Sequence, residues 1–287
     1  MRSLAKPAGV FQEIFNYCVA GVGSNELRAR YIEIFDDLKY DSDHYDVLAA
    51  SGDLWRIPLN AQGNDEIVVG RVTKKELKSL YSSYMVGQDK PARFIYDNLM
   101  ASAPGERCPY CGVGRVSTLD HYLPKSKFPK FSVHIFNLIP ACRDCNLGSK
   151  GTDVAGLIGS QPIHPYYDAE LFNGSQWLFG QVNATAPVSI KFYANPPSTW
   201  SEAARDRAHA HLEAFDLSAR FSVEAAEELA LIRQLFIDYY DGQPAAVRRE
   251  FLLQKEGAEG RLHSNSWKRA MYQALSNNQW YYDGGFR

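Results

Sequence analysis

The sequence lacks any hydrophobic run long enough to cross a membrane. Its longest apolar stretches fall far short of the roughly 20 residues that span a bilayer. The first fifteen residues have no continuous apolar segment and no small-residue cleavage site, so they do not predict a signal peptide. Internal repeats and low-complexity tracts are also absent. We therefore expect a cytoplasmic protein that does not associate with membranes.

The chain also lacks an excess of charge of either sign. Its formal net charge is −2 over 287 residues, which argues against a generally basic surface that coats nucleic acid. The charge is unevenly distributed, because residues 108–150 contain six basic and two acidic side chains, a local charge of +4. A basic patch on an acidic body suits a phosphate-binding site, although an ordinary solvated loop has the same composition.

Cysteine is scarce, and its placement is the most informative feature of the chain. A Cys-x-x-Cys turn directs two thiolates at one point, and two such turns complete a closed tetrahedral site. We therefore predict a structural Zn²⁺; a redox dithiol would need only one pair. Cys18 stands alone in an apolar setting and is predicted to be a small buried side chain. The four predicted ligands are Cys108, Cys111, Cys142 and Cys145.

The second cysteine pair has a competing interpretation. The run PACRDC at residues 140–145 is similar to half of the zinc site of nucleobase deaminases, apart from one inserted alanine. Those enzymes also need a His-x-Glu sequence upstream. The tripeptides that begin at His121 and His134 are HYL and HIF, and neither has the glutamate that acts as general acid and base. We therefore do not predict a deaminase.

The residues between the cysteine pairs predict a small ββα unit. Residues 116–121 and 135–142 read as strands, and residues 143–150 read as the start of a helix. On both sides of this unit the apolar spacing is mostly helical, as in residues 25–40 and 224–240.

The predicted fold class is therefore α+β. It consists of a mainly helical body with a central ββα-metal module held by a four-cysteine zinc site. The predicted regions are a helical N-terminal region at 1–103, the module at 104–155, and a mixed, then helical, C-terminal region at 156–287.

The central stretch resembles a known nuclease family. The segments CPYC, LDHYLPKS and FNLIPACRDCN, followed by Lys150, match the order and spacing of zinc-stapled ββα-metal HNH endonucleases, over about residues 108–150. The resemblance implies metal-dependent hydrolysis of DNA phosphodiester bonds. It also implies a role in bacterial restriction or antiviral defence of the Septu-like kind, with an ATPase partner protein or a second copy of the chain as partner.

The resemblance implies a role for each matching residue. His121 would be the general base that takes a proton from the attacking water. Asp120 and Asn146 would hold a catalytic Mg²⁺ or Mn²⁺. Asn137 would hold the loop that carries the base, and Lys150 would contact a phosphate. Because neighbours in a regular strand face opposite ways, Asp120 and His121 can serve one site only if the strand ends or distorts there.

Two alternatives stay open at this point. The module could be non-catalytic and only bind nucleic acid or protein, or the enzyme could cleave RNA. His134 has no matching role in the family pattern and is predicted to be structural. His164, in the HPYYD segment after the module, is expected to pack against the module.

Overall fold

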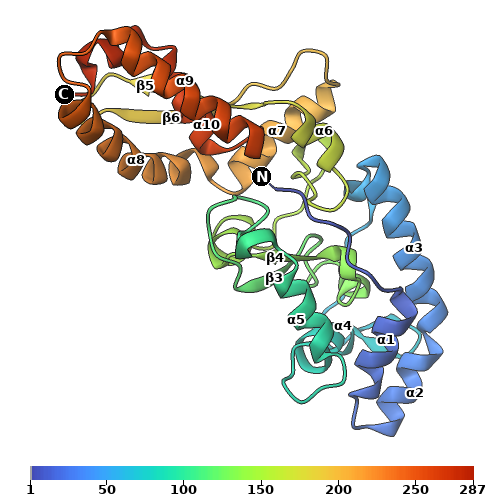
Figure 1. Cartoon of the computed structure of the whole chain (residues 1–287). Coiled ribbons are helices and arrows are strands. Elements are labelled where there is room, and N and C mark those ends of the chain that lie inside the picture. The colour runs from blue at the N-terminus through green and yellow to red at the C-terminus, as the bar shows by residue number, and fades with distance from the viewer. Residues whose placement is uncertain (1) are drawn as a thin grey trace. The chain divides into compact units, whose positions relative to one another are not determined.

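The computed structural model describes residues 2–287 and divides into two compact units. The N-terminal unit comprises Ser3–Asp168, and the C-terminal unit is built from Ala169–Arg287. In Figure 1 the first runs from blue to green and the second from yellow to red. Helices dominate both units and the sheets are small, so the predicted α+β class is confirmed. Among the described residues, no helix has both the length and the apolar character needed to cross a membrane.

Helices make up most of the N-terminal unit. The helical pattern predicted over residues 25–40 is divided at Ile34, where α2 ends and α3 begins. A capping box at Thr73 starts α4, because its hydroxyl accepts from the Glu76 amide while the Glu76 carboxylate accepts from the Thr73 amide. The elements before the cysteine segment are α1 (Phe11–Ala20), α2 (Asn25–Glu33), α3 (Phe35–Ser51), η1 (Leu54–Arg56), β1 (Ile67–Val69), β2 (Val72–Thr73), α4 (Lys74–Ser79), η2 (Leu80–Met85), α5 (Arg93–Ala101) and η3 (Pro104–Glu106).

A ββ hairpin lies at the centre of this unit. Strands β3 (Thr118–His121) and β4 (Leu138–Ala141) pair antiparallel, with His121 opposite Leu138 at one end and Thr118 opposite Ala141 at the other. Between them the chain forms two short 3-10 turns, η4 (Pro129–Phe131) and η5 (Ile135–Asn137). The wide helical turn η6 (Asp144–Lys150) follows β4, and η7 (Ile158–Ser160) lies beyond it.

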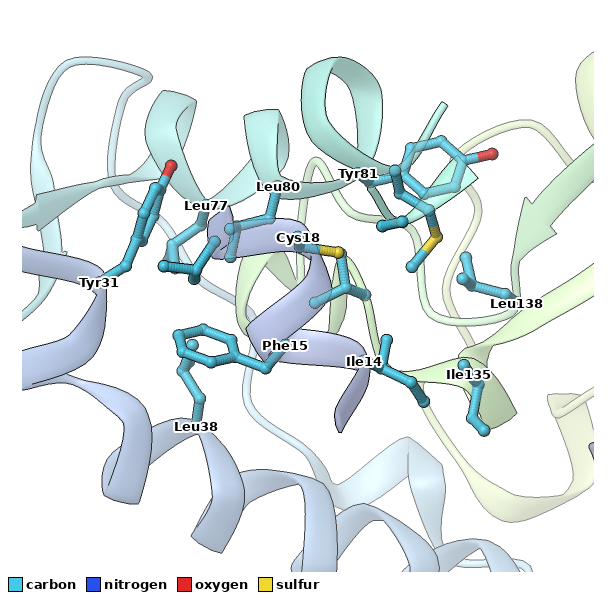
Figure 2. Close-up of a cluster of buried hydrophobic side chains, with 14 of the residues drawn as sticks. Ile14, Phe15, Cys18, Tyr31, Leu38, Leu77, Leu80, Tyr81, Ile135 and Leu138 are labelled. Carbon is cyan, nitrogen blue, oxygen red and sulfur yellow. The ribbon is translucent and has the colours of Figure 1, made fainter. Parts of the chain in front are cut away.

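One hydrophobic core joins this hairpin to the preceding helices. Figure 2 shows Ile14, Phe15 and Cys18 of α1 facing residues of α4 and η2, with Ile135 and Leu138 from the hairpin region beside them. Cys18 is fully buried, as predicted, and burial raises the pKa of its thiol to about 12. Because these side chains share one core, the helices before residue 104 fix the hairpin's position.

The C-terminal unit is a two-stranded sheet covered by helices. Helix α10 packs against β5, and α8 packs against β6. Gly180 of β5 allows α10 to approach closely, because an added Cβ would lie 2.9 Å from the Ala270 carbonyl oxygen. The elements are α6 (Ala169–Gly174), β5 (Leu178–Asn183), β6 (Ser189–Ala194), α7 (Glu202–Ala214), α8 (Leu217–Tyr239), α9 (Ala245–Leu262), α10 (Trp267–Ser276) and η8 (Tyr281–Gly285).

Two hydroxyl residues of this unit fit the local sequence pattern of a helix N-cap but do not cap a helix. Thr199 fits a capping box with Glu202, but the hydroxyl that caps α7 belongs to Ser201, which accepts from the Ala204 amide. Ser222 reads as an N-cap but lies inside α8, where its hydroxyl donates to the Ile190 and Ser218 carbonyls.

Candidate functional site

The four cysteines of the two Cys-x-x-Cys pairs form one buried cluster. Their sulfur atoms all lie within 4.8 Å of one another, and the Cys111 and Cys142 sulfurs are 3.9 Å apart. Tetrahedral zinc with Zn–S bonds of about 2.3 Å requires sulfurs about 3.8 Å apart. The cluster therefore fits a single metal ion such as zinc, with all four positions taken by the protein.

Local backbone turns aim these sulfurs. In the first knuckle the Gly112 amide donates to the Cys108 carbonyl, and the Gly114 amide donates to the Cys111 sulfur at 3.3 Å. Gly112 has a φ of 73°, which favours glycine at this tight turn. In the second knuckle the Asn146 amide donates to the Cys142 carbonyl. Hydrogen bonds among the sulfurs lower the pKa of Cys111 and raise that of Cys145.

Asp120 is buried next to this cluster and forms an ion pair with Lys150. Its side chain is 2% exposed and that of Lys150 is 4% exposed. The Lys150 ammonium lies 3.0 Å from the carboxylate and also donates to the His121 carbonyl at 2.8 Å. Tyr110, from the first knuckle, donates its hydroxyl to Asp120 Oδ2 at 2.8 Å. The structure thus joins Asp120 and Lys150, two of the predicted site residues, to each other and to the metal knuckle.

His121 is the last residue of β3, and its ring has a defined tautomer. Nε2 lies 3.0 Å from the Ser132 carbonyl oxygen. Because a carbonyl can only accept, Nε2 carries the hydrogen, and Nδ1 keeps its lone pair. No hydrogen bond to Nδ1 is found within residues 2–287, and the Tyr81 ring lies edge-on to the imidazole at 4.5 Å. Burial, and then the charge of Lys125, lowers the His121 pKa to about 3, so the ring is neutral near pH 7.

Asn137 holds the loop that connects β3 to η5. Its side chain is fully buried and makes hydrogen bonds on both sides of the loop. Oδ1 accepts from the Leu123 amide at 2.7 Å and from the Tyr45 hydroxyl at 3.2 Å. Nδ2 donates to the carbonyls of Leu123 and Phe131. These bonds fix the segment that begins directly after His121 and supplies the Ser132 carbonyl.

Asn146 is partly exposed at the start of η6. Its Nδ2 donates to the Thr118 hydroxyl at 2.9 Å. The amide oxygen Oδ1 can therefore act as a metal ligand beside strand β3. The side chains of Asp120 and His121 contact different groups, and among the described residues no hydrogen bond joins them.

Two other histidines lie in buried polar networks. His134 lies between the Ser42 hydroxyl at 2.7 Å from Nδ1 and the Asp46 carboxylate at 3.1 Å from Nε2. His164 lies between the hydroxyl of Tyr45 and the amide of Tyr166. Both are at most 2% exposed, so neither is open to a large substrate.

Sequence reasoning missed Tyr110, Ser132 and Tyr81. Tyr110 lies inside the CPYC knuckle. Its position between two predicted metal ligands was the sequence signal that could have pointed to it. Ser132 acts through its backbone carbonyl, so its identity carried no signal. Tyr81 comes from η2, far away in the sequence, and only the fold brings it to His121.

Comparison with known proteins gives one relationship over the full length. The chain is 33% identical over 300 aligned residues to protein ea31 of Escherichia phage lambda, covering 99% of this chain and 100% of the phage protein. The chain therefore belongs to the ea31 family. No family model and no solved structure matches the chain. The name of this ea31 relative states no activity.

Proposed function

We propose that the protein is a metal-dependent endonuclease of the HNH type that hydrolyses DNA phosphodiester bonds. The observation that carries the proposal is the tautomer of His121. With Nε2–H held by a backbone carbonyl, Nδ1 of the neutral imidazole is unprotonated, which is the form that a general base needs. The zinc-compatible cysteine cluster beside β3 supports the module type.

The proposed reaction uses water as the nucleophile. Nδ1 of His121 takes one proton from water as the water oxygen bonds to phosphorus. The ester bond to the leaving oxygen then breaks, and that oxygen takes a proton from solvent. The Ser132 carbonyl keeps Nε2–H in place and stabilises the imidazolium that forms.

The residues proposed for the catalytic Mg²⁺ or Mn²⁺ have suitable oxygen atoms. Asp120 offers a carboxylate, and Asn146 offers Oδ1, both ligand types that these hard cations accept. When bound, the ion supplies charge stabilisation to the phosphate and the leaving oxygen. Lys150 now neutralises Asp120, so a cation at this carboxylate must compete with the ammonium. Lys150 was expected to contact a phosphate. We propose instead that its ammonium competes with the cation for Asp120.

A plasmid-nicking assay tests the proposal. Zinc-loaded wild type, His121→Ala and the control His44→Ala are compared with Mg²⁺ or Mn²⁺, because His44 is an exposed histidine of the same unit. We expect nicking by wild type and by the control but not by His121→Ala. Equal nicking by all three proteins, or no nicking by any of them with either ion, would contradict the proposed mechanism. RNA offered in parallel distinguishes the two substrates.

Restriction or antiviral defence, with an ATPase partner or a second copy of the chain, is the biological setting that we propose for this activity. The support for this setting is the resemblance of residues 108–150 to HNH endonucleases. The ea31 relative is encoded by a phage and does not add to that support. The second candidate, a zinc module that only binds nucleic acid or protein, is favoured by the burial of Asp120. It predicts binding without any dependence of function on His121.

A further inference from the structure

The ammonium group of Lys125 and the ring of the proposed base both contact Tyr81. Lys125 is in the loop after β3, and its Nζ lies 4.5 Å from the centre of the Tyr81 ring. The other neighbour of that ring is His121, at 4.5 Å between ring centres. Tyr81 is thus contacted by both the imidazole and the ammonium, and the charge of Lys125 contributes to the low pKa of His121.

Lys125 differs from Lys130 and Lys150 because it has no ion-pair partner among the described residues. Lys130 is paired with Asp41 at 2.8 Å, and Lys150 is paired with Asp120. Within residues 2–287, no carboxylate lies within ion-pair distance of the Lys125 ammonium. A half-buried ammonium loses part of its hydration, and the Tyr81 ring and the charge of Asp120 offset that loss only in part.

Lys78 of α4 is a second lysine whose positive charge acts on Lys125. Its ammonium donates to the Asn64 side-chain oxygen at 2.9 Å, and it has no ion-pair partner among the described residues. Burial, and after it the charge of Lys78, lowers the pKa of Lys125. An anion at the Lys125 ammonium, which shares the Tyr81 ring with the neutral base, would relieve its repulsion with Lys78.

We propose that Lys125 and Lys78 bind a backbone phosphate of the nucleic acid next to His121. The choice of phosphate as the anion rests on the proposed nuclease function. Lysine binds phosphate as a compact point charge, and neither side chain needs to leave an existing ion pair to do so. The structure thus assigns the phosphate contact to residues 78 and 125 and leaves residue 150 paired inside the module.

Salt-dependent binding tests this assignment separately from cleavage. Full-length, zinc-loaded protein without Mg²⁺ or Mn²⁺ is titrated into a fluorescent DNA duplex, and into an RNA duplex of equal length, at several salt concentrations. The variants are Lys125→Gln, Lys125→Arg and Lys78→Gln. The matched control is Lys90→Gln, because Lys90 also lies over a tyrosine ring, Tyr84, but donates to the Gly21 carbonyl.

We expect each of Lys125→Gln and Lys78→Gln to reduce the salt slope by about 1 and to weaken binding about fivefold at 150 mM salt. Lys125→Arg and the control should bind like wild type. The same loss with DNA and RNA supports a phosphate contact. Lys125→Gln that binds like the control, or a wild-type protein that binds neither duplex, would overturn the assignment. A protein that binds through these lysines but never cleaves would overturn only the nuclease proposal.

Discussion

Replacing Lys150 with methionine should strongly destabilise the N-terminal unit. Methionine keeps most of the side-chain volume but removes the charge that neutralises Asp120, which is 2% exposed. The Tyr110 hydroxyl would remain as a partner of that carboxylate. Breaking a buried pair by removing one partner costs about 3–5 kcal/mol, because the other charge stays buried and uncompensated.

Hydrogen exchange of the zinc-loaded protein measures this cost within the N-terminal unit alone. A loss of about 4 kcal/mol should speed exchange of the β3 amides about a thousandfold, since each factor of ten corresponds to about 1.4 kcal/mol. Amides of β5 and β6, in the C-terminal unit, serve as an internal control.

The double variant Asp120→Asn with Lys150→Met gives the decisive comparison. It removes both charges, so most of the protection of β3 should return. If Lys150→Met alone exchanges like wild type, or if the double variant is as unstable as the single one, then the buried pair does not hold β3 to η6 as we infer.

Three further predictions concern the loop, the base and the cysteine cluster. Asn137→Ala should cost about 3–4 kcal/mol, because it removes four buried hydrogen bonds, and should speed exchange in residues 122–131; unchanged exchange there would contradict its role. The pKa of His121, lowered to about 3 by burial and then by Lys125, should make stability fall between pH 6.5 and pH 3, because only the unfolded state takes the proton there. That contribution is fully present above pH 6.5 and is on the order of 4 kcal/mol; His121→Gln should flatten the urea-unfolding profile against pH, and an equal slope would refute this. Cys142→Ser should lower the zinc content from one ion per chain and loosen only the N-terminal unit, as measured by elemental analysis and hydrogen exchange; full zinc retention would contradict the four-sulfur site.

The parts of the site that the sequence predicted well are those set by short-range geometry. Two Cys-x-x-Cys turns bring their own sulfurs together, and the hairpin between them needs only one pairing to bring the turns face to face. Both strands lie within their predicted ranges, although β4 covers only Leu138–Ala141 because residues 135–137 form a 3-10 turn, and the cysteine cluster was confirmed.

The contacts that could not be predicted depend on burial and on distant segments. The pairing of Lys150 with Asp120 follows from the path of η6 across β3, and helical or strand periodicity does not encode that path. Tyr81 reaches His121 because η2 packs into the same core as the hairpin. The break at Ile34 and the cap of α7 at Ser201 were also missed, because local patterns locate helix ends only to within a residue or two.

Chemical rescue of a His121→Gly variant tests the central claim most directly. Glycine leaves a space beside Tyr81 and the Ser132 carbonyl that free imidazole can fill as a base. The account predicts that the variant, at wild-type zinc content, cleaves plasmid DNA with Mn²⁺ only when imidazole is added, at a rate that rises with imidazole concentration. Cleavage by His121→Gly at the wild-type rate without imidazole would show that His121 is not the base.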